Sequence, residues 1–237
     1  MVRLRDPNGR PVPAYCQIIR NTVVRVIGKA LSALTQRGWA TFDGTLEDVS
    51  NHARKSEWRA VALRRGDKVI SDLHALTAGE ARPNSISSRT GLGAQPLHTD
   101  GAHLDTPPDI VALASTCSHR ASTRLWTSSG ANTPWDELHQ GVFRVSDGMV
   151  HRYRFAGDGD SIGFDPCCMT PMDESSRRVV RFFMSAYETA YRHQWSRYTP
   201  EVLLIDNRRT LHAREAVDPA DPPRHLIRIA FRRPEAT

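Results

Sequence analysis

An imidazole and a carboxylate stand two positions apart in the segment Pro96-Leu97-His98-Thr99-Asp100-Gly101. In extended backbone, residues i and i+2 point to the same face, about 7 Å apart, so His98 and Asp100 would face one side and Thr99 the other. One metal ion can bridge such a pair. The Asp-Gly step favours a turn, which predicts a strand end where the carboxylate can swing onto a metal. A histidine and an aspartate at a surface turn would give the same pattern, so the pair needs a third ligand.

A second histidine follows a separate apolar run. Val202 to Ile205 leads into DNRRTLHAR, where His212 is flanked by apolar residues. Two histidines and one carboxylate form a three-point face on an octahedral iron and leave positions for a bidentate 2-oxo acid and dioxygen. A zinc hydrolase uses the same ligand types, but the sequence has no H-E-x-x-H motif. We therefore predict an iron site made by His98, Asp100 and His212.

Two arginines follow His212 in the strand-like segment RHLIRIAFR. Arg224 and Arg228 are four residues apart, which puts both guanidinium groups on one face of an extended strand. Burying an arginine is costly unless a carboxylate meets it, and the forked guanidinium binds a carboxylate through two charge-assisted hydrogen bonds. Arg224 is the predicted anchor for 2-oxoglutarate. The alternative places both arginines on the outward face of an amphipathic strand.

The N-terminal part of the sequence predicts helices. Between Val23 and Leu34, apolar residues recur at helical spacing, and a glycine ends this pattern before a predicted strand from Trp39 to Phe42. A second helix is predicted from Leu46 to Lys55, with the preceding threonine as its N-cap. We expect residues 1–67 to form a mainly helical N-terminal flank.

From about Lys68 onward, the pattern changes to short β-type runs separated by turn residues. These runs are VISDLHAL, SISSRT, DIVALAST, STRLW, GVFRV, VHRYRF, SIGF, EVLLIDN, RTLHA and RHLIRIAFR. Helices are predicted near Thr133 to His139 and from Glu174 to Tyr187. This order fits a mainly β chain whose barrel or jelly roll has helices packed outside it. We expect a single domain over residues 1–237, with its core in residues 68–237.

The composition indicates an ordinary globular chain. The formal net charge is +6, but acidic residues interleave with the scattered basic ones, which favours a solvated surface over a nucleic-acid site. No signal peptide or membrane-spanning stretch is recognisable, so a cytoplasmic protein with no membrane partner is expected. We expect the four cysteines to be reduced: Cys16, Cys117, Cys167 and Cys168.

Seven other histidines are weaker candidates, because six have no ligand-like company and His103 lies too far along a loop to share the strand face. Surface or structural roles are expected for them. They are His74, His103, His119, His139, His151, His193 and His225.

From about Asn84 to Arg232 the chain resembles the TauD/clavaminate-synthase-like family of Fe(II)- and 2-oxoglutarate-dependent oxygenases. Four ordered motifs carry the resemblance: LHTDG, the threonine-bearing STRLWTSS, LLIDNRRTLHAR and the R-x-x-x-R pair. The resemblance implies a double-stranded β-helix, or jelly-roll, core. It also implies that Thr123 and Arg224 bind the distal carboxylate of 2-oxoglutarate. The family's Gly-Gly pair is missing before Thr123, and Thr127 is the alternative.

The resemblance also extends to the substrate. Arg228 matches a position that meets an acidic group of the substrate in several members, which suits an amino-acid-like or sulfonate-like molecule. Ser88, or alternatively Ser87 or Arg89, matches positions that line the substrate pocket. The segment between the metal-binding motifs is short for the family, which indicates a more open pocket or a lid supplied by a partner subunit in a homo-oligomer.

The expected function is a dioxygenase that uses Fe(II), 2-oxoglutarate and O2 and hydroxylates an unactivated C–H bond, with a role in biosynthesis. Asp100 favours hydroxylation because family halogenases have a small residue there. Desaturation, ring closure and epimerisation use the same iron ligands and stay open. A nucleic-acid base demethylase shares the motif types, but it spaces its arginines differently, and the sequence has no aromatic-rich basic strip. A catalytically silent jelly-roll binding module is the third alternative.

Overall fold

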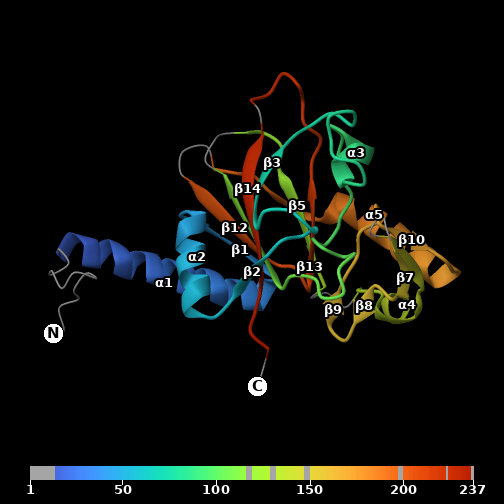
Figure 1. Cartoon of the computed structure of the whole chain (residues 1–237), viewed down its shortest axis with the longest axis horizontal. Coiled ribbons are helices and arrows are strands. Elements are labelled where there is room, and N and C mark those ends of the chain that lie inside the picture. Colours follow the sequence, from blue (N-terminus) through green and yellow to red (C-terminus); the bar gives the residue numbers. More distant parts are fainter. Residues whose placement is uncertain are drawn as a thin grey trace.

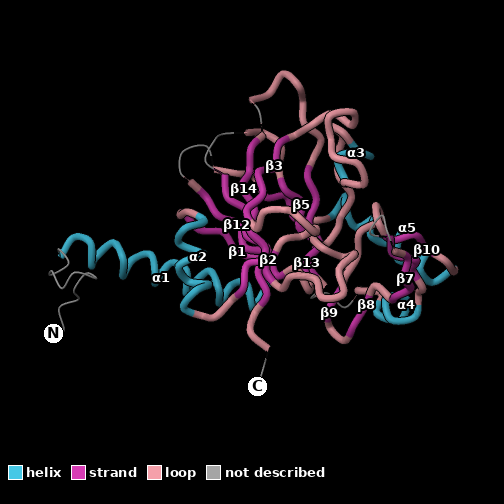
Figure 2. Tube along the Cα trace, in the orientation of Figure 1, coloured by secondary structure: helices cyan, strands magenta, loops and turns pink. Residues whose placement is uncertain are grey.

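The computed structural model describes residues 14–115, 119–128, 132–146, 150–196, 200–222 and 224–235, with side chains from residue 25 onward. Figure 1 shows a central group of strands with α1 and α2 on one side and α4 and α5 on the other. Figure 2 shows the same arrangement by secondary structure. The strands thus form the centre of the molecule, and the helices lie outside them.

The two predicted N-terminal helices are present. Helix α1 spans Ala14–Arg37 and helix α2 spans Leu46–Lys55. Thr45 caps α2 as expected: its hydroxyl accepts from the backbone N–H of Asp48, and the Asp48 carboxylate accepts from the N–H of Thr45 at 2.9 Å. This reciprocal capping satisfies two N–H groups that a helix start otherwise leaves unpaired.

Gly38 joins α1 to the first strand. Its φ of +83° lies in the left-handed region, and a Cβ added there would come within 2.4 Å of Thr210 Oγ1 and 2.6 Å of Thr127 Cγ2. The hydroxyl of Thr210 donates to the Gly38 carbonyl at 2.9 Å. Only glycine fits this close approach between the N-terminal segment and two strands of the core.

Six strands form the larger sheet, in the order β1-β12-β4-β14-β2, with β3 also paired to β14. All pairs are antiparallel. The strands are β1 (Trp39–Asp43), β2 (Arg59–Val61), β3 (Ile70–His74), β4 (Ile110–Ser115), β12 (Glu201–Asp206) and β14 (His225–Arg232). Residues 1–67 thus supply two strands to this sheet as well as two helices. The expected boundary at residue 67 does not separate the flank from the core.

A three-stranded sheet in the order β11-β5-β13 faces the larger one. Its strands are β5 (Thr123–Thr127), β11 (Tyr191–His193) and β13 (Thr210–Arg214). The space between the sheets is filled by buried apolar residues: Val111, Leu113, Leu125, Trp195, Leu203, Ile205, Leu226 and Ala230. Two antiparallel sheets packed in this way confirm the mainly β, jelly-roll fold class expected from the sequence.

Alternation along the strands separates the layers. On β4, Val111 and Leu113 face the smaller sheet, whereas Ile110 and Ala112 pack on the other side with α1 and α2. On β13, Leu211 and Ala213 pack in the cluster that contains Val179 and Phe183 of α5 (Glu174–Thr189). Because side chains alternate, His212 must point the opposite way, into the space between the sheets.

The remaining elements cover the α5 side of the molecule. They are α4 (Trp135–Gln140), β6 (Phe143–Ser146), β7 (His151–Arg154), β8 (Gly157–Asp158), β9 (Ser161–Ile162) and β10 (Met169–Pro171). Strands β10, β6 and β7 form one small sheet, and β8 pairs with β9. The runs GVFRV and VHRYRF are therefore strands as predicted.

One expected strand is wrong. The segment SISSRT contains the short helix α3 (Ile86–Thr90). Ser85 begins it as N-cap, with its hydroxyl accepting from the backbone N–H of Ser88 at 3.1 Å, and Gly91, at φ +53°, ends it. Serine favours helix caps over strand interiors because its hydroxyl bonds to nearby backbone groups. The capping chemistry outweighed the β-type appearance of the run.

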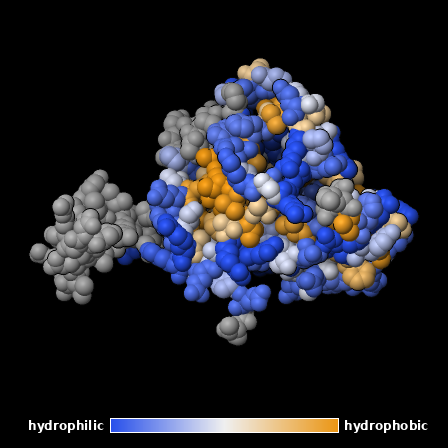
Figure 3. Space-filling model, viewed as in Figure 1, coloured by the Kyte–Doolittle hydropathy of each residue, from blue (hydrophilic) through white to orange (hydrophobic). Residues whose placement is uncertain are grey.

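The surface in Figure 3 is mostly hydrophilic, with apolar residues gathered near the centre of the view. None of the helices in the described part of the chain has the length and apolar character needed to cross a membrane. Cys167 and Cys168 are free thiols, and burial raises the pKa of Cys167 to about 11. The side chain of Cys16 and all of Cys117 lie outside the described residues.

Candidate metal centre

His98 and His212 form a directly opposed backbone pair. The N–H of His98 donates to the carbonyl of His212 at 3.0 Å, and the N–H of His212 donates to the carbonyl of His98 at 2.9 Å. Directly opposed residues of an antiparallel pair extend their side chains from the same face. The two imidazole rings accordingly lie with their centroids 4.5 Å apart.

Asp100 completes the group of three. One ligand-type atom from each of His98, Asp100 and His212 lies within 4.8 Å of the others, and all three residues are buried. Nε2 of His212 is 4.0 Å from Oδ2 of Asp100. A sequence spacing of two and a β-bridge thus bring together all three predicted ligands.

Hydrogen bonds orient the histidine rings. Nδ1 of His98 lies 2.9 Å from the carbonyl oxygen of Pro96. A carbonyl only accepts, so Nδ1 carries the proton and Nε2 keeps the lone pair that a metal requires. Burial, followed by the influence of His98, lowers the pKa of His212 to about 3, and Arg228 and Arg224 add to this lowering against the opposing effect of Asp100. His212 is therefore a neutral imidazole, the form that ligates metals.

Asp100 is held as a carboxylate by its charged neighbours. Burial by itself would raise its pKa, but Arg228, His212 and His98 outweigh burial, and the pKa is lowered. Nη1 of Arg228 donates to both oxygens of Asp100, at 2.9 and 3.1 Å. The predicted substrate-binding arginine is therefore bound to a predicted metal ligand in this structure.

Asn207 fixes the backbone of Asp100, and the sequence analysis missed it. Its side-chain oxygen accepts from the N–H of Asp100 at 2.8 Å, and its Nδ2 donates to the carbonyls of Asp100 and Pro108, each at 2.9 Å. The residue is completely buried. The signal in the sequence is a polar amide shortly after the buried apolar run Val202 to Ile205 that leads to His212.

Asn207→Ala should therefore lower both the stability of the fold and the affinity for Fe(II). Three hydrogen bonds disappear and their buried partners are left unpaired, so we expect a loss of about 3 kcal/mol in the free energy of unfolding. Outer partners of metal ligands typically contribute about 10- to 100-fold in metal affinity, and we expect a loss in that range. Urea denaturation and anaerobic Fe(II) dialysis measure the two effects. Asn51→Ala, an exposed helical asparagine, is the control, and equal behaviour of both variants would contradict the assigned role.

Arg224 directly precedes β14 and has few partners among the described residues. It is 7% exposed, its Nε has no hydrogen-bond partner among the described residues, and Nη2 lies 3.5 Å from Thr123 Oγ1. Burial, and then the charge of Arg214, lower its pKa to about 9. A buried cation without a carboxylate is costly, so this geometry is typical of an anion site.

Thr123 stands beside Arg224, as predicted. Its hydroxyl oxygen accepts from Nε1 of the buried Trp195 at 3.1 Å, which leaves the hydroxyl proton available to a ligand. The alternative residue, Thr127, lies four residues along β5 and bonds to Thr210 Oγ1 at 3.1 Å. The structure thus brings Thr123, and not Thr127, to Arg224.

Two buried histidines, His119 and His193, lie against Trp195, the tryptophan that bonds to Thr123. Rings of His119 and His193 lie 5.8 and 4.9 Å from the ring of Trp195. Burial, and then the charge of Arg224, lower the pKa of His119 to about 4, and burial lowers that of His193 to about 4. Both rings are therefore neutral at physiological pH.

These histidines predict acid sensitivity. The pKa of each histidine is 6.5 in the unfolded chain and about 4 in the folded chain, so between these pH values the unfolded chain binds more protons. Stability is therefore complete above pH 6.5 and is lost as the pH falls toward 4, by roughly 3 kcal/mol for each histidine. Urea unfolding between pH 7.5 and 4.5 measures this loss. His119→Gln should flatten the slope relative to wild type, and an unchanged slope would refute the assignment.

The hydrogen bonds given by the described residues join Ser88 to Ser85 and not to the metal centre. Its hydroxyl donates to the carbonyl of Ser85 at 2.7 Å, within the cap of α3, and Ser87 Oγ accepts from Gln95 Nε2 at 3.3 Å. The expectation that Ser88, Ser87 or Arg89 contacts substrate stays a prediction.

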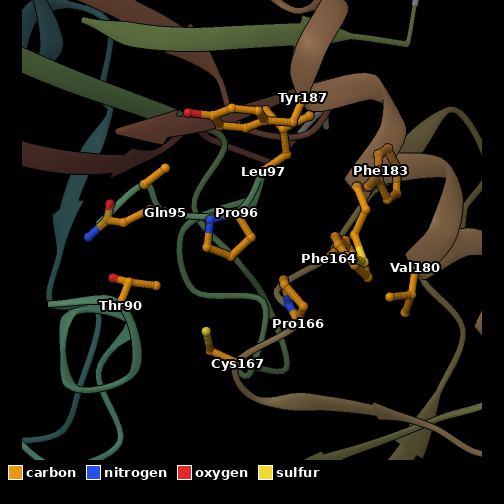
Figure 4. A pocket seen from close by; sticks show the side chains of 12 residues that line it. Thr90, Gln95, Pro96, Leu97, Phe164, Pro166, Cys167, Val180, Phe183 and Tyr187 are labelled. Atoms are coloured by element: carbon orange, nitrogen blue, oxygen red, sulfur yellow. The ribbon is translucent and has the colours of Figure 1, made fainter. Parts of the chain in front are cut away.

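An apolar cavity of about 380 Å³ lies on the other side of the segment that carries His98. Figure 4 shows Pro96, Leu97, Phe164 and Phe183 among its labelled lining residues. Leu97 and His98 are consecutive in extended backbone, so their side chains point to opposite sides. No member of the metal triad lines this cavity, which is therefore distinct from the metal centre.

The sequence interpretation was wrong for two other histidines. His74 and His225 were expected to lack ligand-type company, but they lie together with Asp72 in a second group of three possible ligands. The three residues come from neighbouring strands that are far apart in the sequence. Their proximity required knowledge of the sheet register.

The C-terminal part of the chain matches the model of a known protein family. Residues 135–230 match the model for the family described as taurine catabolism dioxygenase TauD, TfdA family. This part of the chain is similar to the TauD/TfdA family. The TauD/TfdA match includes His212, Arg224 and Arg228 but begins after His98 and Asp100, whose assignment rests on the geometry described above. No curated protein sequence matches the chain.

Solved oxygenase structures share the fold of this chain. An asparagine oxygenase in complex with Fe(II), 3-hydroxyasparagine and succinate has 15% identity and a TM-score of 0.64, covering 90% of this chain and 79% of that one. The non-heme iron oxygenase OrfP with 3-hydroxyarginine has 14% identity and a TM-score of 0.61, with coverage of 89% and 79%. The PvcB protein from Pseudomonas aeruginosa has 16% identity and a TM-score of 0.57, with coverage of 96% and 89%.

Proposed function

We propose that this protein is an Fe(II)- and 2-oxoglutarate-dependent dioxygenase that hydroxylates a small amino-acid-like substrate. The observation that carries the proposal is the buried group of His98, Asp100 and His212, whose ligand-type atoms lie within 4.8 Å of one another. Two imidazoles and one carboxylate are the donor set of non-heme iron oxygenases. A cytoplasmic location belongs to the same proposal.

The residues fit the metal that this donor set implies. Fe(II) would be held by His98, Asp100 and His212, and it would bind 2-oxoglutarate and O2 and supply the oxidising chemistry. Arg228 bonds to both carboxylate oxygens of Asp100 and keeps that group ionised. Asn207 holds the Asp100 backbone, and Pro96 fixes the tautomer of His98.

Arg224 and Thr123 would bind the distal carboxylate of 2-oxoglutarate. The buried guanidinium of Arg224 provides a charged donor, and the Thr123 hydroxyl can donate because Trp195 already occupies its oxygen as a hydrogen-bond donor. This arrangement would orient the keto-acid end of 2-oxoglutarate toward the metal. When bound, Fe(II) and 2-oxoglutarate would supply the oxidation: one oxygen atom of O2 would enter the substrate and the other succinate, with release of CO2 from 2-oxoglutarate.

The substrate class rests on the printed contents of related structures and on Arg228. The asparagine oxygenase and OrfP structures hold hydroxylated amino acids. Arg228 lies on the same face of β14 as Arg224, and its side chain is 20% exposed. It would meet an acidic group of the substrate while still bonding to Asp100. A homo-oligomer that supplies a lid over this pocket stays a prediction.

Succinate formation tests the proposal. Purified protein with Fe(II), 2-oxoglutarate and air should form succinate, and a screen of free and carrier-bound amino acids should identify one that accelerates it. The product should gain one oxygen atom by mass spectrometry. Absence of succinate under all conditions would favour a silent binding module instead. Stimulation by methylated oligonucleotides, with strongly salt-dependent binding, would favour the base demethylase.

A further inference from the structure

A second group of possible metal ligands lies on the outer face of the larger sheet, away from the proposed iron site. It consists of Asp72 and His74 on β3 and His225 on β14. One ligand-type atom from each residue lies within 4.8 Å of the other two. Within the described part of the chain, this group and the buried triad are the two that meet this criterion.

The strand register explains why the three side chains meet. His225 is paired directly with His74, and Asp72 is two residues from His74 on the same strand. Asp72 and His74 therefore point to the same face, as does His225 opposite them. The intervening residues Leu73 and Leu226 pack toward the core between the sheets. The ligand-type side chains must then lie on the outer face.

The contacts within the group already resemble a ligand arrangement. The rings of His74 and His225 are parallel to within 2°, with centroids 4.5 Å apart. Nε2 of His225 lies 3.1 Å from Oδ1 of Asp72. An imidazole ring can offer one nitrogen lone pair to a metal, and a carboxylate neutralises part of the charge of a divalent ion.

We propose that Asp72, His74 and His225 bind a divalent metal ion of the zinc class, with solvent completing the coordination. Two imidazoles and one carboxylate suit Zn²⁺, which accepts four ligands in tetrahedral geometry at distances of about 2.0–2.2 Å. The solvent-exposed position leaves room for water. This site is independent of the proposed oxygenase function, because none of its residues belongs to the buried triad.

The ion would link strand β3 to strand β14, which directly follows Arg224, the proposed 2-oxoglutarate anchor. Strand β3 pairs only with β14 among the described strands of its sheet. His225 directly follows Arg224, and β14 also contains Arg228. A metal bridging β3 and β14 would therefore restrain the backbone next to both arginines, and its binding would stabilise the folded chain by mass action.

Zinc titration of the full chain tests the site. Metal-free protein should bind two Zn²⁺ ions in equilibrium dialysis with elemental analysis, because the buried triad also accepts zinc. The His225→Ala and Asp72→Asn variants should each bind one ion with unchanged circular dichroism, and the His98→Ala/His212→Ala double variant should also bind one. In that double variant, zinc should raise the melting temperature, and adding His225→Ala should abolish the rise. His151→Ala, an exposed strand histidine, is the matched control and should keep two ions.

Three outcomes would overturn the proposal. Wild-type protein could bind a single zinc ion that disappears with His98→Ala/His212→Ala. The stoichiometry could stay at two in both His225→Ala and Asp72→Asn, which would assign the second ion to other residues. His151→Ala could lose an ion as readily as His225→Ala. Because the readout is zinc binding, loss of succinate formation would not affect it, and the two proposals can fail separately.

Discussion

His212→Ala should abolish Fe(II) binding and succinate formation together. The substitution removes one of three converging ligands from a buried site. Loss of an outer hydrogen-bond partner of a ligand typically costs about 10- to 100-fold, so loss of the ligand itself should cost more than about 100-fold in affinity. Anaerobic equilibrium dialysis with Fe(II) and a succinate assay under air measure the two quantities.

The control for this variant is His193→Ala. His193 is also buried, but it lies beside Trp195 and outside the triad. It should retain Fe(II) binding even where stability falls. Comparable Fe(II) affinity in His212→Ala and wild type would remove His212 from the site and with it the central part of the proposed function.

Arg224→Met should weaken 2-oxoglutarate binding and, at the same time, leave the ligand-free protein at least as stable as wild type. Two charge-assisted hydrogen bonds to a carboxylate contribute roughly 3–4 kcal/mol, which corresponds to a 100- to 1,000-fold rise in the 2-oxoglutarate KM. In the free protein, however, Arg224 is a buried cation without a carboxylate partner among the described residues. Replacing such a charge with an apolar side chain relieves a desolvation cost.

Arg214→Met provides the matched comparison. Arg214 is similarly buried, but its Nη2 donates to the carbonyls of Gly91 and Gly93 at 2.6 and 2.7 Å. Its removal leaves two carbonyls unpaired and should lower the melting temperature. If Arg224→Met instead destabilised the protein as much as Arg214→Met and left the 2-oxoglutarate KM unchanged, Arg224 would be a structural arginine.

The sequence was sufficient for those parts of the site that depend on local spacing. Two residues of a strand separated by one residue share a face, which is why His98 with Asp100, and Arg224 with Arg228, could be paired before the fold was known. Turn and capping chemistry likewise predicted α2 from Thr45 onward, and β-type periodicity predicted most of the strands. The resemblance to an oxygenase family added Thr123, which the structure places beside Arg224.

Contacts between residues far apart in the sequence could not be predicted from local spacing. Asn207 bonds to Asp100, 107 residues away in the sequence, and Trp195 bonds to Thr123, 72 residues away, so no local spacing links either pair. The group of Asp72, His74 and His225 depends on the register of β3 against β14. The error at SISSRT was of another kind, because serine hydroxyls can support a helix cap as readily as a polar strand.

The bridge between His98 and His212 also bears on when the metal can be bound during synthesis. The ribosome releases His98 and Asp100 well before β13, so the nascent chain first presents an imidazole and a carboxylate without their third partner. Two ligands on an unfolded segment hold a divalent ion weakly, because a preformed metal site rarely exists before folding. If these residues hold the proposed metal, the pairing of the two histidine backbones would delay tight binding until β13 has formed and brought His212 opposite His98.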